Sequence, residues 1–70
     1  MPFGTLHIET GWLNENHGQL VLRVDGGRRW RLDVGPILAW RARRLVGKRV
    51  RVEGVRDGFD LLDVGRIMPE

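Results

Sequence analysis

The side chains of this sequence best suited to binding chemistry are arginines that alternate with apolar residues. Arg23 lies in one alternating stretch, and Arg29 and Arg31 lie in the next. A guanidinium group matches the geometry of a phosphate and stacks on flat rings. Aromatic rings beside arginines are a common means of holding single-stranded nucleic acid. The candidate ligand-binding residues, for single-stranded nucleic acid or another polyanion, are therefore Trp12, Arg23, Arg29 and Arg31.

A plainer interpretation of the same arginines stays open. Asp25, Asp33 and Glu9 lie close to them in the sequence, and these carboxylates can neutralise them as parts of an ordinary charged surface. Eleven of the twelve basic residues are arginine, which a GC-rich coding sequence would also produce.

A second candidate surface lies in the segment that follows Gly35. Ile37, Trp40 and Arg44 fall on one side of a helical wheel, opposite the apolar side. An exposed tryptophan near an arginine is typical of a protein-interaction surface or a cation–π pair. The alternative is that Trp40 covers one end of the folded domain.

The sequence offers little for catalysis or for metal binding. It has no Ser, Cys or Tyr, so the usual pairs of nucleophile and base cannot be assembled. Asp57, Asp60 and Asp63 are spaced by three but form no known calcium loop. His7 and His17 have no partner motif. We therefore expect a non-enzyme, with no catalytic residues, no metal and no cofactor.

Length, charge and hydropathy predict one small domain over residues 1–70. The net charge is +3, with nine acidic residues interspersed among twelve basic ones. The longest apolar run, residues 37–40, is far too short to cross a membrane. The first ten residues lack the basic and apolar regions of a secretory signal. A cytoplasmic location without membrane contact is expected.

Residues 6–9 predict the first strand, with Leu6 and Ile8 facing inward. Leu13 is out of phase with Ile8, so a bulge or sharp bend at Thr10-Gly11 would keep both inside. That arrangement turns Trp12 outward. Without the bulge, Trp12 would belong to the core. We favour the bend.

Residues 20–24 and 29–34 predict two further strands joined by a glycine turn. A two-residue turn would mix the two faces, whereas the three-residue loop Gly26-Gly27-Arg28 keeps the apolar side chains together. This loop pairs Val24 with Trp30 and places Arg23 opposite Arg31. Like charges that face each other in a sheet are unfavourable, and an anion between them would relieve the repulsion.

Pro36 and Gly47 predict the start and the end of a helix, since Pro suits the first helical position and Gly the position after the last. Its inward face is expected to carry Leu38, Ala42, Leu45 and Val46.

The final hairpin is predicted from the alternation of residues 50–54 and the turn at Asp57-Gly58. Its turn has an odd number of residues if Val52 faces Val64. The odd step from Val64 to Ile67 predicts a bulge near Gly65.

The order of these elements is β-β-β-α-β-β. It predicts an OB-fold-like, five-stranded Greek-key barrel with its helix between the third and fourth strands. Such barrels bind ligands on the outer surface of the second and third strands, where the arginines are expected.

A family resemblance covers most of residues 20–67. The matching residues are Asp25-Gly26-Gly27, Trp30-Arg31-Leu32-Asp33, Arg43-Arg44-Leu45, the segment 47–63 and Arg66-Ile67. Together they resemble a family of small stand-alone bacterial domains of unknown function. The resemblance implies an OB-like fold and no particular activity.

The sequence therefore favours a binding module over an enzyme. The leading hypothesis is weak, sequence-tolerant binding of single-stranded nucleic acid or another polyanion through an arginine-rich barrel face. The alternative is a protein-interaction or homo-oligomerisation domain that uses Ile37, Trp40 and Arg44, or an exposed barrel edge.

Overall fold

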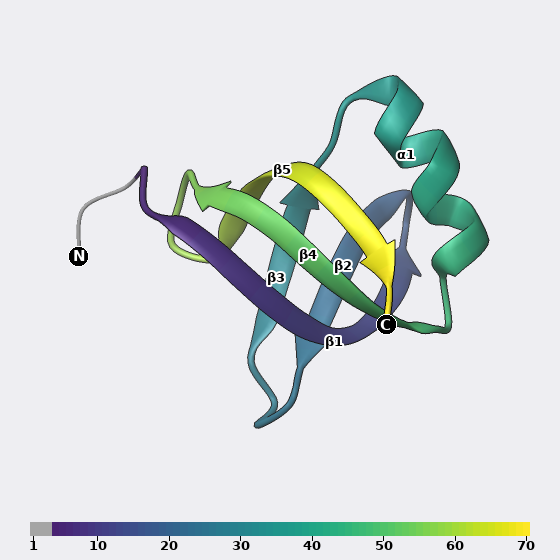
Figure 1. Cartoon of the computed structure of the whole chain (residues 1–70), viewed down its shortest axis with the longest axis horizontal. Coiled ribbons are helices and arrows are strands. Elements are labelled where there is room, and N and C mark those ends of the chain that lie inside the picture. Colours follow the sequence, from purple (N-terminus) through teal and green to yellow (C-terminus); the bar gives the residue numbers. More distant parts are fainter. Residues whose placement is uncertain (1–3) are drawn as a thin grey trace.

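The computed structural model describes residues 4–70. The expectation about the first ten residues falls partly on residues 1–3, which lie outside this range. Five strands, one α-helix and one short 3-10 helix follow one another in the predicted order (Figure 1). They are β1 (Leu6–Asn16), β2 (Gln19–Val24), β3 (Arg29–Asp33), α1 (Pro36–Ala42), η1 (Arg43–Leu45), β4 (Arg49–Arg56) and β5 (Leu61–Pro69).

The strands close into a barrel in the order β1-β2-β3-β5-β4, with β4 returning to β1. Only the β3–β5 pair is parallel among these strands. The OB-fold-like, five-stranded barrel is thus confirmed. Closure gives every strand two neighbours, which is how small barrels limit edge-to-edge aggregation. Residues 6–10 of β1 and 64–69 of β5 pair with β4 alone, so the exposed barrel edge that the sequence left open as an interaction surface stays a prediction.

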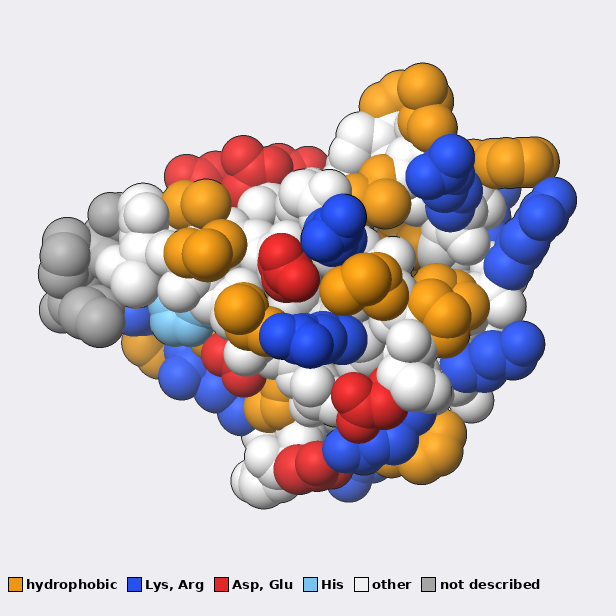
Figure 2. All heavy atoms as spheres, in the orientation of Figure 1, with side chains coloured by type: hydrophobic (Ala, Val, Ile, Leu, Met, Phe, Trp, Pro, Cys, Tyr) orange, Lys and Arg blue, Asp and Glu red, His pale blue; other side chains and the backbone are white. Residues whose placement is uncertain are grey.

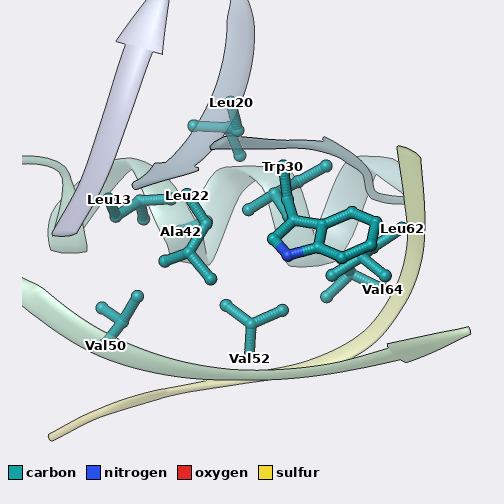
Figure 3. Packing of buried hydrophobic residues seen from close by; sticks show 10 residues of the cluster. Leu13, Leu20, Leu22, Trp30, Ala42, Val50, Val52, Leu62 and Val64 are labelled. Atoms are coloured by element: carbon teal, nitrogen blue, oxygen red, sulfur yellow. The ribbon is translucent and has the colours of Figure 1, made fainter. Parts of the chain in front are cut away.

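The barrel is filled by apolar side chains from every strand and from α1 (Figure 3). Trp30 lies at its centre with 1% of its surface exposed. The buried set is Leu13, Leu20, Leu22, Trp30, Leu32, Ala42, Val50, Val52, Leu62 and Val64. The inward alternation predicted for β2, β3 and β4 is therefore observed.

The prediction for the first strand is wrong in part. The register of β1 runs without a bulge against both β2 and β4, and Ile8 is 51% exposed. His7 is half-buried instead, with its ring 5.3 Å from that of Trp30 and its Nδ1 3.3 Å from Glu9. Because Gly11 and Leu13 face inward, strict alternation forces His7 and Glu9 inward and Trp12 outward.

Two predicted registers are also wrong. In the β2–β3 hairpin Leu22 pairs with Trp30, and the amide of Val24 donates to the carbonyl of Arg28, so the loop is Asp25-Gly26-Gly27. In the β4–β5 hairpin Val52 pairs with Ile67, not with Val64. In both hairpins the pairing register is shifted, but the same apolar residues stay inside. The prediction that each turn has an odd number of residues is therefore still correct.

The bulge at Gly65 is confirmed. Glu53 pairs with Arg66 while the next residue, Gly54, pairs with Val64, which leaves Gly65 without an opposite residue. The bulge restores Ile67 to the inner side, where it packs against the core.

Helix α1 lies at one end of the barrel (Figure 1). It starts at Pro36 as predicted, but it gives way to the 3-10 helix η1 at Arg43. Gly47 then ends the segment with φ +84°, a conformation that glycine adopts without strain. Ala42 is buried, and Leu38 and Leu45 pack against the core, whereas Val46 is 37% exposed and lies outside it. Among the described residues, no helix has the length and apolar character needed to cross a bilayer.

Candidate functional site

The outer face of the barrel carries a row of side chains across three strands. Trp12 on β1 pairs with Arg23 on β2, and Arg23 pairs with Arg29 on β3. All three are exposed, Trp12 by 47%. Paired residues of neighbouring strands project to the same side of a sheet, so we call Trp12, Arg23 and Arg29 the basic row.

The partner of Arg23 differs from the sequence prediction. Arg23 lies opposite Arg29 and not Arg31, because the loop begins one residue earlier than expected and the pairing register therefore shifts by two residues. The shift by two keeps every arginine on the outer face. The like-charge contact that the sequence predicted is therefore present, but with a different pair.

Two of the three predicted arginines are unpaired. Within residues 4–70, the side chains of Arg23 and Arg29 make no hydrogen bond and no ion pair. Arg31 is held by Asp60, which accepts bonds from its Nε at 3.0 Å and its Nη2 at 2.8 Å. The plainer interpretation was that Asp25, Asp33 and Glu9 neutralise these three arginines. Among the described residues, none of these carboxylates forms an ion pair with Arg23, Arg29 or Arg31.

A hollow of about 380 Å³ opens on this face beside the basic row. Three carboxamide side chains and one valine line it together with the arginines and Asp60. The lining residues are Asn14, Asn16, Gln19, Val21, Arg23, Arg29, Arg31 and Asp60. The surface thus combines two free cations with groups that both donate and accept hydrogen bonds.

Trp12 is flanked on its other side by β4. It pairs with Arg49, whose guanidinium carbon lies 6.0 Å from the centre of the indole. Arg49 donates two bonds to the carboxylate of Asp25, at 3.0 and 2.7 Å. These bonds, together with the positive charge of Arg49, hold the pKa of the Asp25 carboxyl below its ordinary value. The loop after β2 is therefore tied to β4 beside the indole.

Sequence reasoning missed the loop between β4 and β5 as part of this region. Arg28 and Arg56 both donate to the carbonyl of Phe59, at 3.4 and 3.2 Å, and Arg56 also donates to the carbonyl of Gly58 at 3.0 Å. Phe59 itself is 81% exposed. The sequence did offer one signal for this loop, which is an aromatic residue in the polar turn of residues 57–60. A phenylalanine in such a turn is rarely part of the core, so it could have been predicted to be exposed.

The second predicted set lies elsewhere, on α1 and η1. Ile37 is 74% exposed and Trp40 is 60% exposed, so Trp40 does not close the barrel end. The guanidinium carbon of Arg44 lies 4.7 Å from the centre of the Trp40 ring, which is a cation–π contact.

Residues 4–70 hold no group of three or more His, Cys, Asp or Glu side chains arranged to bind a metal ion. Asp60 is engaged by Arg31, and the backbone amide of Asp57 closes the turn on the carbonyl of Leu61.

The fold and this surface define a small OB-fold-like barrel whose outer face carries unpaired arginines beside an exposed tryptophan. The chain belongs to the family described as "Protein of unknown function (DUF5818)", whose profile matches residues 10–70. The predicted resemblance to a family of unknown function is thereby confirmed. The match begins at residue 10, nearer the N-terminus than the predicted residues 20–67. No curated protein and no solved structure matches the chain.

Proposed function

We propose that this domain is a non-catalytic module that binds single-stranded nucleic acid, weakly and with little sequence preference, on the outer face of β1, β2 and β3. One observation carries the proposal. Arg23 and Arg29 face each other, with no neutralising partner among residues 4–70, directly beside the exposed ring of Trp12. Two facing cations repel each other, and a phosphate between them removes that repulsion.

The neighbouring side chains favour a single strand over a compact anion. A base can stack on Trp12, which contributes about 1–3 kcal/mol per base whatever its identity. The carboxamides of Asn14, Asn16 and Gln19 can pair with base edges in the hollow. A duplex keeps its bases stacked inside and offers Trp12 no free ring face.

The test is a titration of a fluorescently labelled homothymidine oligonucleotide at several salt concentrations. Two phosphate contacts predict that log K falls with log salt with a slope of about −1.4. The double variant Arg23→Ala/Arg29→Ala should lose this slope and bind at least about tenfold more weakly. Trp12→Ala should weaken binding by a comparable factor without changing the slope.

The matched control is Arg51→Ala/Arg66→Ala, which removes the same charge from exposed positions of β4 and β5. It should retain most of the affinity. Absence of binding at every salt concentration, or an equal loss in the control variant, would refute the proposal.

A further inference from the structure

The excess positive charge of the chain is concentrated in one segment. Residues 36–48 carry four basic side chains and no acidic one, whereas the rest of the chain carries eight basic and nine acidic side chains. The net charge of +3 therefore arises from α1, η1 and the turn that follows. Figure 2 shows hydrophobic and basic side chains projecting together at the upper right, where α1 lies, with no acidic side chain among them.

These four cations have no anionic partner in the described part of the chain. Arg41, Arg43, Arg44 and Lys48 are all exposed, and none of their side chains forms an ion pair or a hydrogen bond. Among residues 4–70, the one aromatic contact of these charged groups is that of the Arg44 guanidinium with the ring of Trp40. Elsewhere on the barrel, Arg31 and Arg49 are paired with carboxylates.

The same segment exposes apolar surface. Ile37 and Trp40, three residues apart, project from α1 with most of their surface in solvent. Beside Ile37, a hollow of about 390 Å³ lies between α1 and the bulge of β5. It is lined by Gly35, Pro36, Ile37, Leu38, Arg41, Val64 and Gly65. We call these residues, with Trp40, Arg43, Arg44 and Lys48, the α1 patch.

We propose that the α1 patch docks an acidic segment of another protein that carries large apolar side chains. An apolar side chain of the partner enters the hollow beside Ile37, a second covers Trp40, and carboxylates pair with Arg41 and Arg44. A partly exposed tryptophan next to an arginine is the composition of interaction hot spots. Complementary charge steers the encounter and excludes basic partners.

Three other occupants fit less well. A membrane surface would receive only two apolar side chains from a seven-residue helix, and it has no side chain to fill the hollow. Nucleic acid has no long, flexible apolar side chain to place in the hollow beside Ile37. A second copy of this chain has three of its nine carboxylates, those of Asp25, Asp60 and Glu70, already paired with its own arginines.

The test is selection of a displayed library of random dodecapeptides on the immobilised protein, followed by affinity measurements on a synthetic selected peptide. The selected peptides should share Asp or Glu residues beside Leu, Phe or Trp. Ile37→Ser/Trp40→Ala should weaken binding at least about tenfold, whereas Phe59→Ala, which removes a still more exposed ring from outside the patch, should not. Arg41→Glu/Arg44→Glu should abolish binding, and Arg51→Glu/Arg66→Glu should retain it. Arg23→Ala/Arg29→Ala should leave peptide affinity unchanged, which separates this surface from the basic row.

Four results would overturn the inference. The first is no enrichment, or enrichment of peptides without acidic residues. The second is binding that survives the Ile37 and Trp40 changes. The third is binding of anionic phosphatidylglycerol vesicles, or of the labelled oligonucleotide, that depends on the same residues. The fourth is a dimer in light scattering that Trp40→Ala abolishes, because it would assign the patch to a second copy.

Discussion

Gly11 is the single residue on which barrel closure depends most. It pairs with Val24 of β2 and with Val50 of β4, where the long strand β1 passes from one neighbour to the other. A Cβ atom at Gly11 would lie only 2.1 Å from the carbonyl oxygen of Arg23. Backbone therefore occupies the space that any side chain would need.

Gly11→Ala should lower the free energy of unfolding by about 3 kcal/mol or more, because a rigid strand must move to admit the methyl group. Urea denaturation measures this change. Gly65→Ala is the control, since a Cβ there meets nothing within 4 Å. It should change stability by only about 0.5 kcal/mol. Equal losses in both variants would contradict the role assigned to Gly11.

The Asp25–Arg49 pair makes a prediction about pH. The folded state holds the pKa of Asp25 below its ordinary value of 3.8, chiefly through the hydrogen bonds from Arg49. The stabilisation is therefore present above the unfolded pKa and is lost as the pH falls through the folded pKa. Carboxyl-carbon NMR should place the Asp25 midpoint below 3.8 in the wild type. Arg49→Met should raise it, whereas Arg51→Met should leave it in place. An unchanged midpoint in Arg49→Met would show that the pair does not form in solution.

At the scale of the element, the alternation of apolar and polar residues predicted the faces of β2, β3 and β4 but not their registers. Registers that differ by two residues bury the same side chains, so Asp25-Gly26-Gly27 and Gly26-Gly27-Arg28 were equally compatible with the pattern. The observed loop places Gly26 and Gly27 at φ +100° and +93°. It also frees Arg28 to lie 4.1 Å over the ring of Trp30, a long-range contact that no local pattern encodes.

The first strand shows a different limit. Leu6 and Ile8 are the apolar residues of their stretch, and local pattern places them inside. The position of Gly11 overrides this preference, because the close approach of Arg23 requires the residue without a side chain at that point. Trp12 was thus predicted on the correct face, but the bulge or bend expected at Thr10-Gly11 does not keep Ile8 inside, because Ile8 is 51% exposed. Phe59 was missed because its loop is fixed by Arg28 and Arg56, which are distant from each other in the sequence.

The loop between β4 and β5 gives a prediction that bears on the proposed function. Asp60→Asn should release the guanidinium of Arg31 to a third phosphate, while the backbone bond from Arg31 to the carbonyl of Asp60, 2.7 Å long, keeps the loop in place. Oligonucleotide affinity should rise several-fold, and the salt slope should steepen from about −1.4 to about −2.1. Glu15→Gln makes the same charge change outside the hollow and should leave the slope unaltered. An equal gain from Glu15→Gln would attribute the effect to net charge alone.

At the scale of the whole molecule, closure decides where ligands can bind. Every strand has a neighbour on both sides for at least part of its length, so we expect recognition to rely mainly on side chains. The two surfaces with unpaired cations lie on different elements. The basic row crosses β1, β2 and β3, and the α1 patch covers the helix. The two proposals therefore assign a nucleic acid and a protein segment to separate surfaces of this domain.

Neighbouring strands of the barrel are joined by ladders of different length. The parallel seam between β3 and β5 has three residue pairs, whereas β1–β4 and β4–β5 have seven each. Asp33 and Asp63 face each other across this seam, and both are exposed. Because like charges opposite each other weaken a ladder, local opening is expected to begin there, before global unfolding.

Native-state hydrogen exchange tests this expectation. The amide of Arg31, which donates to Asp60 at the seam, should exchange with a smaller opening free energy than that of Leu13, which donates to Lys48 between β1 and β4. Asp63→Lys replaces the repulsion with an attraction to Asp33 and should raise the opening free energy at Arg31 by about 0.2–1 kcal/mol. If the Arg31 amide exchanges only by global unfolding, at the same free energy as Leu13, the parallel seam is not the weak point and the barrel opens as one unit.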